Sequence, residues 1–344
     1  MTRNSAAQVR RVVASRTLAR HLLLGALAAL ATCSCALAFA PYQNLQLATG
    51  AGYLCGVAGL TVLTGTSGQI SLGHGALMAV GAYATALLLT DLHWPMPTAL
   101  AGGTAAAALT GALVGTATAR LQGPYLAGAT LTLAVGLPAL ANYHPFRDTL
   151  GGENGLVVAP PVPPAGLASQ IPLERWHAWI AVACATAVLI LLANLKHSRT
   201  GRSWRAARDD EVSASLCGIR VARLRVLAFI VSAGCAGLGG SLLAIITSVA
   251  APGAFALALS LSLLAGAVIG GLGSLTGAVC GAAVLVLLPQ WASNVAEALH
   301  LSQGFYDNLP LALYGLALML SIIVFPQGIH GAVARLTRTL RRRP

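Results

Sequence analysis

Long apolar blocks separated by short polar stretches run along the chain from about residue 21 to residue 325. A helix of about 20 apolar residues crosses the hydrocarbon core of a bilayer, which is roughly 30 Å thick. Ten blocks approach that length, and they lie at 21–40, 45–64, 71–90, 98–118, 123–141, 176–195, 226–249, 257–272, 274–289 and 309–325. The pattern predicts an all-α, polytopic membrane bundle of about ten transmembrane helices.

The amino-acid composition agrees with a membrane-embedded chain. Of the 344 residues, 56% are hydrophobic and only 9% are charged, whereas a soluble domain carries about 25% charged residues. Glycine supplies 38 residues and aromatic residues only 5%, and small residues let helices approach closely in lipid. The composition excludes an ordinary soluble enzyme and a disordered chain.

The formal net charge of +12 is concentrated between the apolar blocks. Of 21 basic residues, five lie in 1–20, eight in 196–225, five in 335–343, and Arg120 lies between two predicted spans. Lysine and arginine accumulate in cytoplasmic loops of membrane proteins. We therefore expect both termini and residues 196–225 to be cytoplasmic. Nucleic-acid binding is not expected, because it would need a basic face interleaved with aromatic residues.

The same charge pattern divides the chain into a basic cytoplasmic segment (1–20), a membrane domain (21–325) and a basic cytoplasmic tail (326–344). A cleavable signal sequence is the alternative for the amino terminus, because Ala38-Phe39-Ala40 resembles a small-residue cleavage site. The preceding apolar stretch is longer than a usual signal core and Pro41 follows directly. A retained first helix is therefore expected.

A polar, glycine-rich stretch from Thr64 to Gly75 interrupts two apolar blocks. Non-helical backbone at membrane depth needs protein or a water-filled cavity around it, and transporters build substrate paths from such broken helices. An interfacial loop with capping residues is an equally good interpretation, so at least one discontinuous helix is an open prediction.

Polar side chains in and near this stretch are candidates for the substrate path. They are Ser67, Gln69, Ser71 and His74, with Asn154 from the long loop at 142–175. Hydroxyl and amide groups satisfy the ammonium and carboxylate of a zwitterion. A purely structural role is the alternative, and we favour it slightly for His74 because intramembrane polar groups often pair locally.

Catalytic and energy-converting motifs are missing from the sequence. Lys196 is the only lysine and precedes His197, so a phosphate-binding G-x-x-x-x-G-K-[ST] loop is impossible. No acidic residue falls inside a predicted span, which argues against coupling to an ion gradient. Histidines and cysteines show no metal-ligand spacing, so no enzyme activity, metal or cofactor is expected. Energy would have to come from another subunit.

The cytoplasmic segment 198–219 carries a predicted short amphipathic helix. Its acidic start is Asp209, Asp210 and Glu211, and its apolar stripe is Val212, Leu216 and Ile219. Acids suit the positive end of a helix, and Gly218 is suited to ending it. Such a helix, flanked by arginines, predicts docking into a groove on a partner. A loop resting on anionic lipid is the alternative, which explains the arginines alone.

Six short blocks in this chain resemble the permeases of branched-chain amino-acid ABC importers of the LivM type. In order they are Gly68-Gln69-Ile70-Ser71-Leu72-Gly73-His74-Gly75-Ala76 with Gly81-Ala82-Tyr83, Gly123-Pro124-Tyr125-Leu126, Gly151-Gly152-Glu153-Asn154-Gly155-Leu156, Glu211 with Ala214 and Gly218, Gly270-Gly271-Leu272-Gly273-Ser274, and Phe325-Pro326-Gln327-Gly328. The Glu211 block is similar to a divergent E-A-A-x-x-x-G coupling loop. Two departures stand out: no acid follows Ala129-Thr130-Leu131, and Val212-Ser213 replaces the usual alanines.

The resemblance implies one permease subunit of a multisubunit importer in a bacterial cytoplasmic (inner) membrane. Its implied partners are two ATP-binding subunits, a sister permease expected to form a heterodimer with it, a periplasmic or lipid-anchored solute-binding protein, and membrane lipid. The implied solutes are branched-chain or related hydrophobic amino acids; urea, short amides or other small organic acids are the alternative. The residues implied in coupling to the ATPase are Arg205, Arg208, Asp209, Asp210, Glu211, Ala214 and Gly218.

Overall fold

The computed structural model describes residues 2–119, 121, 123–163 and 171–298, with nine single positions between 309 and 331. Apart from those positions, the predicted span at 309–325 and the tail 326–344 lie outside the described residues.

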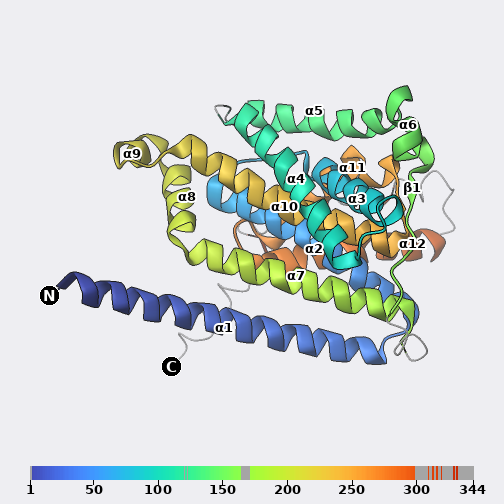
Figure 1. Cartoon of the computed structure of the whole chain (residues 1–344), viewed down its shortest axis with the longest axis horizontal. Helices are drawn as coiled ribbons and strands as arrows, with labels where there is room; N and C mark the ends of the chain where they lie inside the picture. Colours follow the sequence, from blue (N-terminus) through green and yellow to red (C-terminus); the bar gives the residue numbers. More distant parts are fainter. Residues whose placement is uncertain are drawn as a thin grey trace.

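Helices form nearly all of the described chain (Figure 1). They are α1 (Thr2–Ala38), α2 (Pro41–Ser67), α3 (His74–Thr90), α4 (Met96–Thr118), α5 (Pro124–Ala141), α6 (His144–Leu150), α7 (Leu173–His197), α8 (Arg199–Asp209), α9 (Glu211–Leu216), α10 (Val221–Thr247), α11 (Leu257–Gly270) and α12 (Leu275–Ala298). Short 3₁₀ helices η1 (Gly152–Asn154) and η2 (Pro252–Phe255) flank the antiparallel pair of β1 (Leu156–Val157) and β2 (Val249–Ala250). Each of the first nine predicted spans overlaps one helix, which confirms the all-α class.

Six helical segments within the described residues are long and apolar enough to cross a membrane. The number becomes seven if Tyr125–Ala141 and His144–Leu150, which meet at a 79° bend, form one span. The apolar helices His74–Thr90 and Leu275–Trp291 are shorter. The chain is therefore a helical membrane protein, while the predicted count of ten spans is not confirmed.

α10 lies at the centre of the bundle and packs against α2, α3 and α4 (Figure 1). Glycines permit this approach: a Cβ on Gly81 would lie 2.2 Å from the carbonyl oxygen of Gly237, and one on Gly240 would lie 1.9 Å from that of Met78. Backbones in contact gain dispersion energy that larger residues would prevent. Apolar side chains are thereby buried along most of α10.

α1 lies at the edge of the bundle along α7 (Figure 1). Within Leu18–Ala38, only 6% of the residues in the most apolar stretch of 18 are buried. The side chains of Leu23, Leu27 and Leu30 are between 61% and 67% exposed. Leucines exposed around a helix of this length fit a hydrocarbon environment.

Basic side chains of residues 196–225 contact backbone carbonyls of other segments at one end of the bundle. Lys196 donates to the carbonyl of Gly273, and Arg208 donates to that of Gly65. Arg225 donates to the carbonyl of Ala119 over 3.4 Å. At the start of α7, Arg175 donates to the carbonyl of Leu37, near the end of α1, over 3.2 Å. Which end of the bundle faces the cytoplasm stays a prediction.

Candidate coupling and transport site

α8 is anchored to the start of α10 by a buried tryptophan. The side chain of Trp204 is 1% exposed, and its indole Nε1 donates to the carbonyl of Leu224 over 2.8 Å. Ser198 caps the start of α8, and its hydroxyl accepts from the backbone amide of Gly201. A buried indole with a satisfied N–H fixes one helix on another, so α8 is attached firmly to α10.

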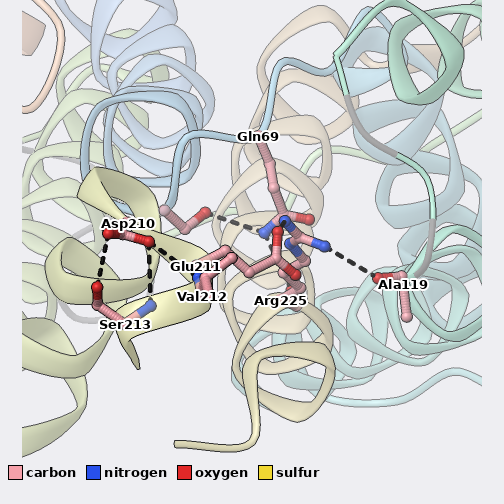
Figure 2. Close-up of polar contacts among 8 residues, drawn as sticks. Gln69, Ala119, Asp210, Glu211, Val212, Ser213 and Arg225 are labelled. Atoms are coloured by element: carbon pink, nitrogen blue, oxygen red, sulfur yellow. Dashed lines mark hydrogen bonds and ion pairs between the residues drawn. The ribbon is translucent and has the colours of Figure 1, made fainter. Parts of the chain in front are cut away.

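Asp210 caps the start of α9, where the sequence predicts an acidic helix start (Figure 2). The carboxylate of Asp210 accepts from the Ser213 hydroxyl (2.6 Å) and from the amides of Val212 (2.9 Å) and Ser213 (3.0 Å). These bonds, the Ser213 hydroxyl first, lower the pKa of Asp210 below its usual value, with an opposing effect from desolvation. The cap is therefore ionised at neutral pH.

The other end of α9 is closed by Gly218, which confirms the predicted stop. Gly218 has φ of +80°, a conformation that residues with a Cβ rarely adopt. Its amide donates to the carbonyl of Ser215 over 2.9 Å, and the Ile219 amide donates to that of Ala214 over 3.1 Å. This pair of bonds is a Schellman motif. Nothing lies within 4 Å of the position that a Cβ would take at Gly218, so its requirement for glycine is conformational.

The apolar stripe of α9 faces outward. Val212 is 68% exposed and Leu216 is 83% exposed, whereas Ala214 is only 4% exposed. Ala214 therefore seats the helix against the protein, while Val212 and Leu216 stand on an otherwise polar surface. Exposed apolar side chains on a short helix suit a groove on another protein.

Arg208 connects α8 to the carboxyl end of α2. Its guanidinium donates to the carbonyl of Gly65 and pairs with the carboxylate of Asp209 at 2.6 Å. Gly68 has φ of +73°, and a Cβ there would lie 2.8 Å from the Arg208 Cγ. A cation beside the last carbonyls of a helix interacts favourably with its dipole. Arg205 is exposed.

Glu211 is held within the protein by Arg225. The Glu211 Oε2 and Arg225 Nη2 atoms are 2.7 Å apart, and the side chains are 39% and 16% exposed. The predicted coupling residue Glu211 therefore makes an internal ion pair, in addition to any contact with a partner.

The break between α2 and α3 turns its polar side chains inward. Gln69 is 6% exposed and Ser71 is 0% exposed, whereas Ile70 between them is 43% exposed. Gln69 Nε2 donates to the Ser67 hydroxyl over 2.9 Å and to the carbonyl of Arg225 over 3.3 Å. Polar groups inside and an apolar side chain outside suit an apolar surrounding. The arrangement favours a discontinuous helix over an exposed loop.

His74 is fully buried at the start of α3. One ring nitrogen lies 3.1 Å from the Ser71 hydroxyl and the other 2.7 Å from the Ser232 hydroxyl on α10. The following amide, that of Gly75, donates to the Ser260 hydroxyl on α11 over 2.9 Å. Each ring nitrogen thus has a protein partner, which supports the structural interpretation of His74. Contact with a solute stays a prediction.

The structure brings four of the five predicted path residues onto one break and leaves Asn154 apart. Asn154 ends η1, is exposed, and makes no side-chain hydrogen bond to the other four within the described residues. η1 packs beside η2, which precedes α11. The same described residues contain no group of three or more His, Cys, Asp or Glu placed to hold a metal ion.

Sequence reasoning missed Trp204 and Arg225 as parts of this site. The signal in the sequence is that Trp204 is a lone aromatic residue among arginines, a pattern that indicates an anchor. Arg225 counted only as a topological charge, because its partner Glu211 lies 14 residues earlier, outside any helical spacing. Ser232 was equally unmarked, since it lies 158 residues from His74.

The fold and the site define a polytopic helical membrane protein with a buried helix break and a helical segment presented at one end. Residues 45–325 match the family described as branched-chain amino acid transport system / permease component, and the chain belongs to this family.

Individual relatives agree with the family. The chain is 32% identical to the high-affinity branched-chain amino acid transport system permease protein LivM of Salmonella typhimurium over 296 residues, covering 79% of this chain and 66% of the relative. It is 31% identical to LivM of Escherichia coli K12 over 294 residues, with the same shares. LivH of Salmonella typhimurium is 27% identical over 304 residues, covering 82% and 92%. The chain thus spans just under two thirds of its LivM relatives' length. No solved structure matches it.

Proposed function

We propose that this chain is a permease subunit of an ATP-binding-cassette importer for branched-chain or related hydrophobic amino acids. The observation that carries the proposal is the family match over residues 45–325, together with relatives whose names specify branched-chain amino acid transport. Import of urea, short amides or small organic acids by the same architecture has no such support.

The motor of this importer would reside in two separate ATP-binding subunits. A phosphate-binding loop is impossible in the sequence because its single lysine is followed by histidine. The outward apolar pair Val212 and Leu216 on α9 is the surface that we assign to the ATPase. Arg205, Arg208, Asp209, Asp210, Glu211, Ala214 and Gly218 shape or flank that surface.

The remaining parts of the assembly follow from the same proposal. A sister permease would complete the path as a heterodimer, and a periplasmic or lipid-anchored binding protein would deliver the solute. The chain would lie in the bacterial inner membrane with both termini in the cytoplasm. Rocking of helices around the break at residues 67–74 would then alternate access, and Asn154 would lie at the outer mouth of the path.

Uptake in cells tests the solute and the role together. Deleting the gene should abolish high-affinity uptake of labelled leucine, isoleucine or valine, and restoring it should recover that uptake. Labelled urea is the comparison solute and should enter at an unchanged rate. Unchanged uptake of all three amino acids in the deletion strain, with the other subunits expressed, contradicts the proposal.

A further inference from the structure

We infer that Arg225 is the positioning residue that transmits movement of α9 to the break between α2 and α3. The inference rests on the proposed function, because it concerns how an ATPase-driven displacement reaches the transport path. Arg225 is not among the residues that the sequence predicts for coupling to the ATPase.

The side chain of Arg225 joins two elements at the end of the bundle (Figure 2). Its Nη2 contacts the carboxylate of Glu211 on α9 at 2.7 Å, and its Nη1 donates to the carbonyl of Ala119 after α4 at 3.4 Å. A guanidinium presents several donors in a rigid plane, so one side chain holds both partners in a fixed relation.

The backbone of Arg225 reaches the break. Its carbonyl accepts from Gln69 Nε2 at 3.3 Å, and the same amide nitrogen donates to the Ser67 hydroxyl at 2.9 Å. Figure 2 shows Gln69 extending from the α2–α3 connection toward Arg225. A continuous series of polar contacts therefore runs from Glu211 through Arg225 and Gln69 to Ser67.

A second contact reaches the end of α2, but it comes from α8 and its side chains are more exposed to water. Arg208 also touches α2, at the carbonyl of Gly65, but its side chain is 40% exposed and its ionic partner Asp209 is 63% exposed. Exposed ion pairs contribute little because water screens them. The Arg225 side chain is only 16% exposed, so its ion pair is screened less, and we assign the main link to it.

Two roles of Arg225, positioning α9 or only supporting the fold, lead to different expected results. A residue needed only for folding changes the amount of assembled importer and leaves the activity of each assembled complex intact. A residue that positions α9 against the break changes the solute moved per ATP hydrolysed. The measured quantity is therefore uptake per ATP in the purified, reconstituted complex with its ATPase and binding-protein subunits.

The variants are Arg225→Gln, Glu211→Gln, their double, the conservative Arg225→Lys, and Arg223→Gln. Arg223 is an exposed arginine on the same helix and serves as the matched control.

We expect Arg225→Gln to assemble normally, to hydrolyse ATP within about twofold of the unmodified complex, and to lose about tenfold in uptake per ATP. The double variant should lose no more than Arg225→Gln alone, because both changes break one link. Arg225→Lys should recover most of the loss, and Arg223→Gln should change nothing.

Three results overturn the inference while leaving the proposed function intact, provided that the unmodified complex shows ATP-driven uptake. They are unchanged uptake per ATP in Arg225→Gln, additive losses in the double variant, and failure of Arg225→Gln to assemble. Absence of ATP-driven amino-acid uptake by the unmodified complex would overturn the proposed function, and the inference with it.

Discussion

Single glycines decide how closely the central helices of this chain approach one another. Gly81 on α3 faces the backbone of Gly237 on α10, and Gly237 in turn meets Ala107 on α4. At such contacts even one methyl group has no space, because the nearest atoms are backbone atoms or the Cβ of Ala107, which cannot rotate away. Packing at these positions is therefore sensitive to the smallest change in side-chain volume.

Gly81→Ala should destabilise the bundle by about 1–3 kcal/mol through overpacking, since its Cβ would lie 2.2 Å from the Gly237 oxygen. Gly128→Ala is the matched control in α5, where nothing lies within 4 Å of the new Cβ; there alanine should stabilise by about 0.5–1 kcal/mol. Thermal unfolding in detergent measures both. Equal melting temperatures for the two variants would contradict the close-packing argument.

Asp210 provides a second prediction at this scale. Its hydrogen bonds lower the pKa of the carboxyl from the ordinary value of 3.8, so the stabilisation is fully present above that value and is lost as the pH falls through the lowered pKa. We expect the α9 cap to be unaffected between about pH 5 and pH 8.

Hydrogen exchange of the α9 amides at neutral pH tests the Asp210 cap. Asp210→Ala should accelerate exchange at residues 213–218, whereas Asp210→Asn should preserve protection because asparagine also caps helices well. Equal acceleration in the two variants would mean that the negative charge, rather than the cap, holds the helix.

The site residues whose roles the sequence predicts correctly are those that depend on near neighbours in the chain. The Asp210 cap and the Gly218 stop depend on neighbours within eight positions, so spacing alone identifies them. The partners of His74 and Glu211 are Ser232 and Arg225. Those contacts depend on how distant helices meet, and no local pattern encodes that.

At the scale of elements, α9 is a short helix with both ends capped, one side packed against the protein and the other side exposed. Asp210 and Gly218 fix its two ends, Ala214 and the Glu211–Arg225 pair fix its inner side, and Leu216 stands free of the bundle at 83% exposure. An element this short does not hold its shape in isolation. The surrounding contacts therefore preform the surface that a partner would bind.

Replacing Val212 and Leu216 together by serine should weaken binding of the ATP-binding subunits by more than about tenfold, because each buried aliphatic side chain contributes about 1.5–3 kcal/mol. Stability of the chain itself should change by less than about 0.5 kcal/mol, since both side chains are exposed. Copurification from membranes measures the association. Val157→Ser, at a 73% exposed position in β1, is the control and should copurify normally; loss of the ATPase in that variant as well would contradict the assignment to α9.

Hydropathy does not predict where individual helices begin and end. The third span was predicted to begin at residue 71, but α3 begins at His74 because residues 68–73 are held by side chains of other helices, including the Thr130 hydroxyl on the Leu72 amide. The bend after α5 was not predicted either. Apolar content identifies that a helix exists, while its ends depend on tertiary hydrogen bonds.

At the scale of the whole molecule, basic side chains of residues 196–225, which the charge pattern predicts to be cytoplasmic, contact other segments of the bundle. Lys196, Arg208 and Arg225 each donate to a carbonyl at the end of another segment. The charges that predict orientation thus also tie one end of the bundle together.

Accessibility labelling tests the orientation. In a chain whose other cysteines are replaced by serine, the exposed Cys217 should react with a membrane-permeant maleimide and not with an impermeant one added to intact spheroplasts. A cysteine introduced by Asn154→Cys, at an exposed position in η1, should react with both reagents. Reaction of Cys217 with the impermeant reagent would place α9 on the wrong side for a cytoplasmic ATPase.

The most direct test is transport by purified components in proteoliposomes. The complete complex, supplied with its binding protein and ATP, should accumulate labelled leucine, and the same vesicles without ATP or without the ATP-binding subunits should not. Accumulation of leucine by this chain in vesicles that lack any ATPase would contradict the account.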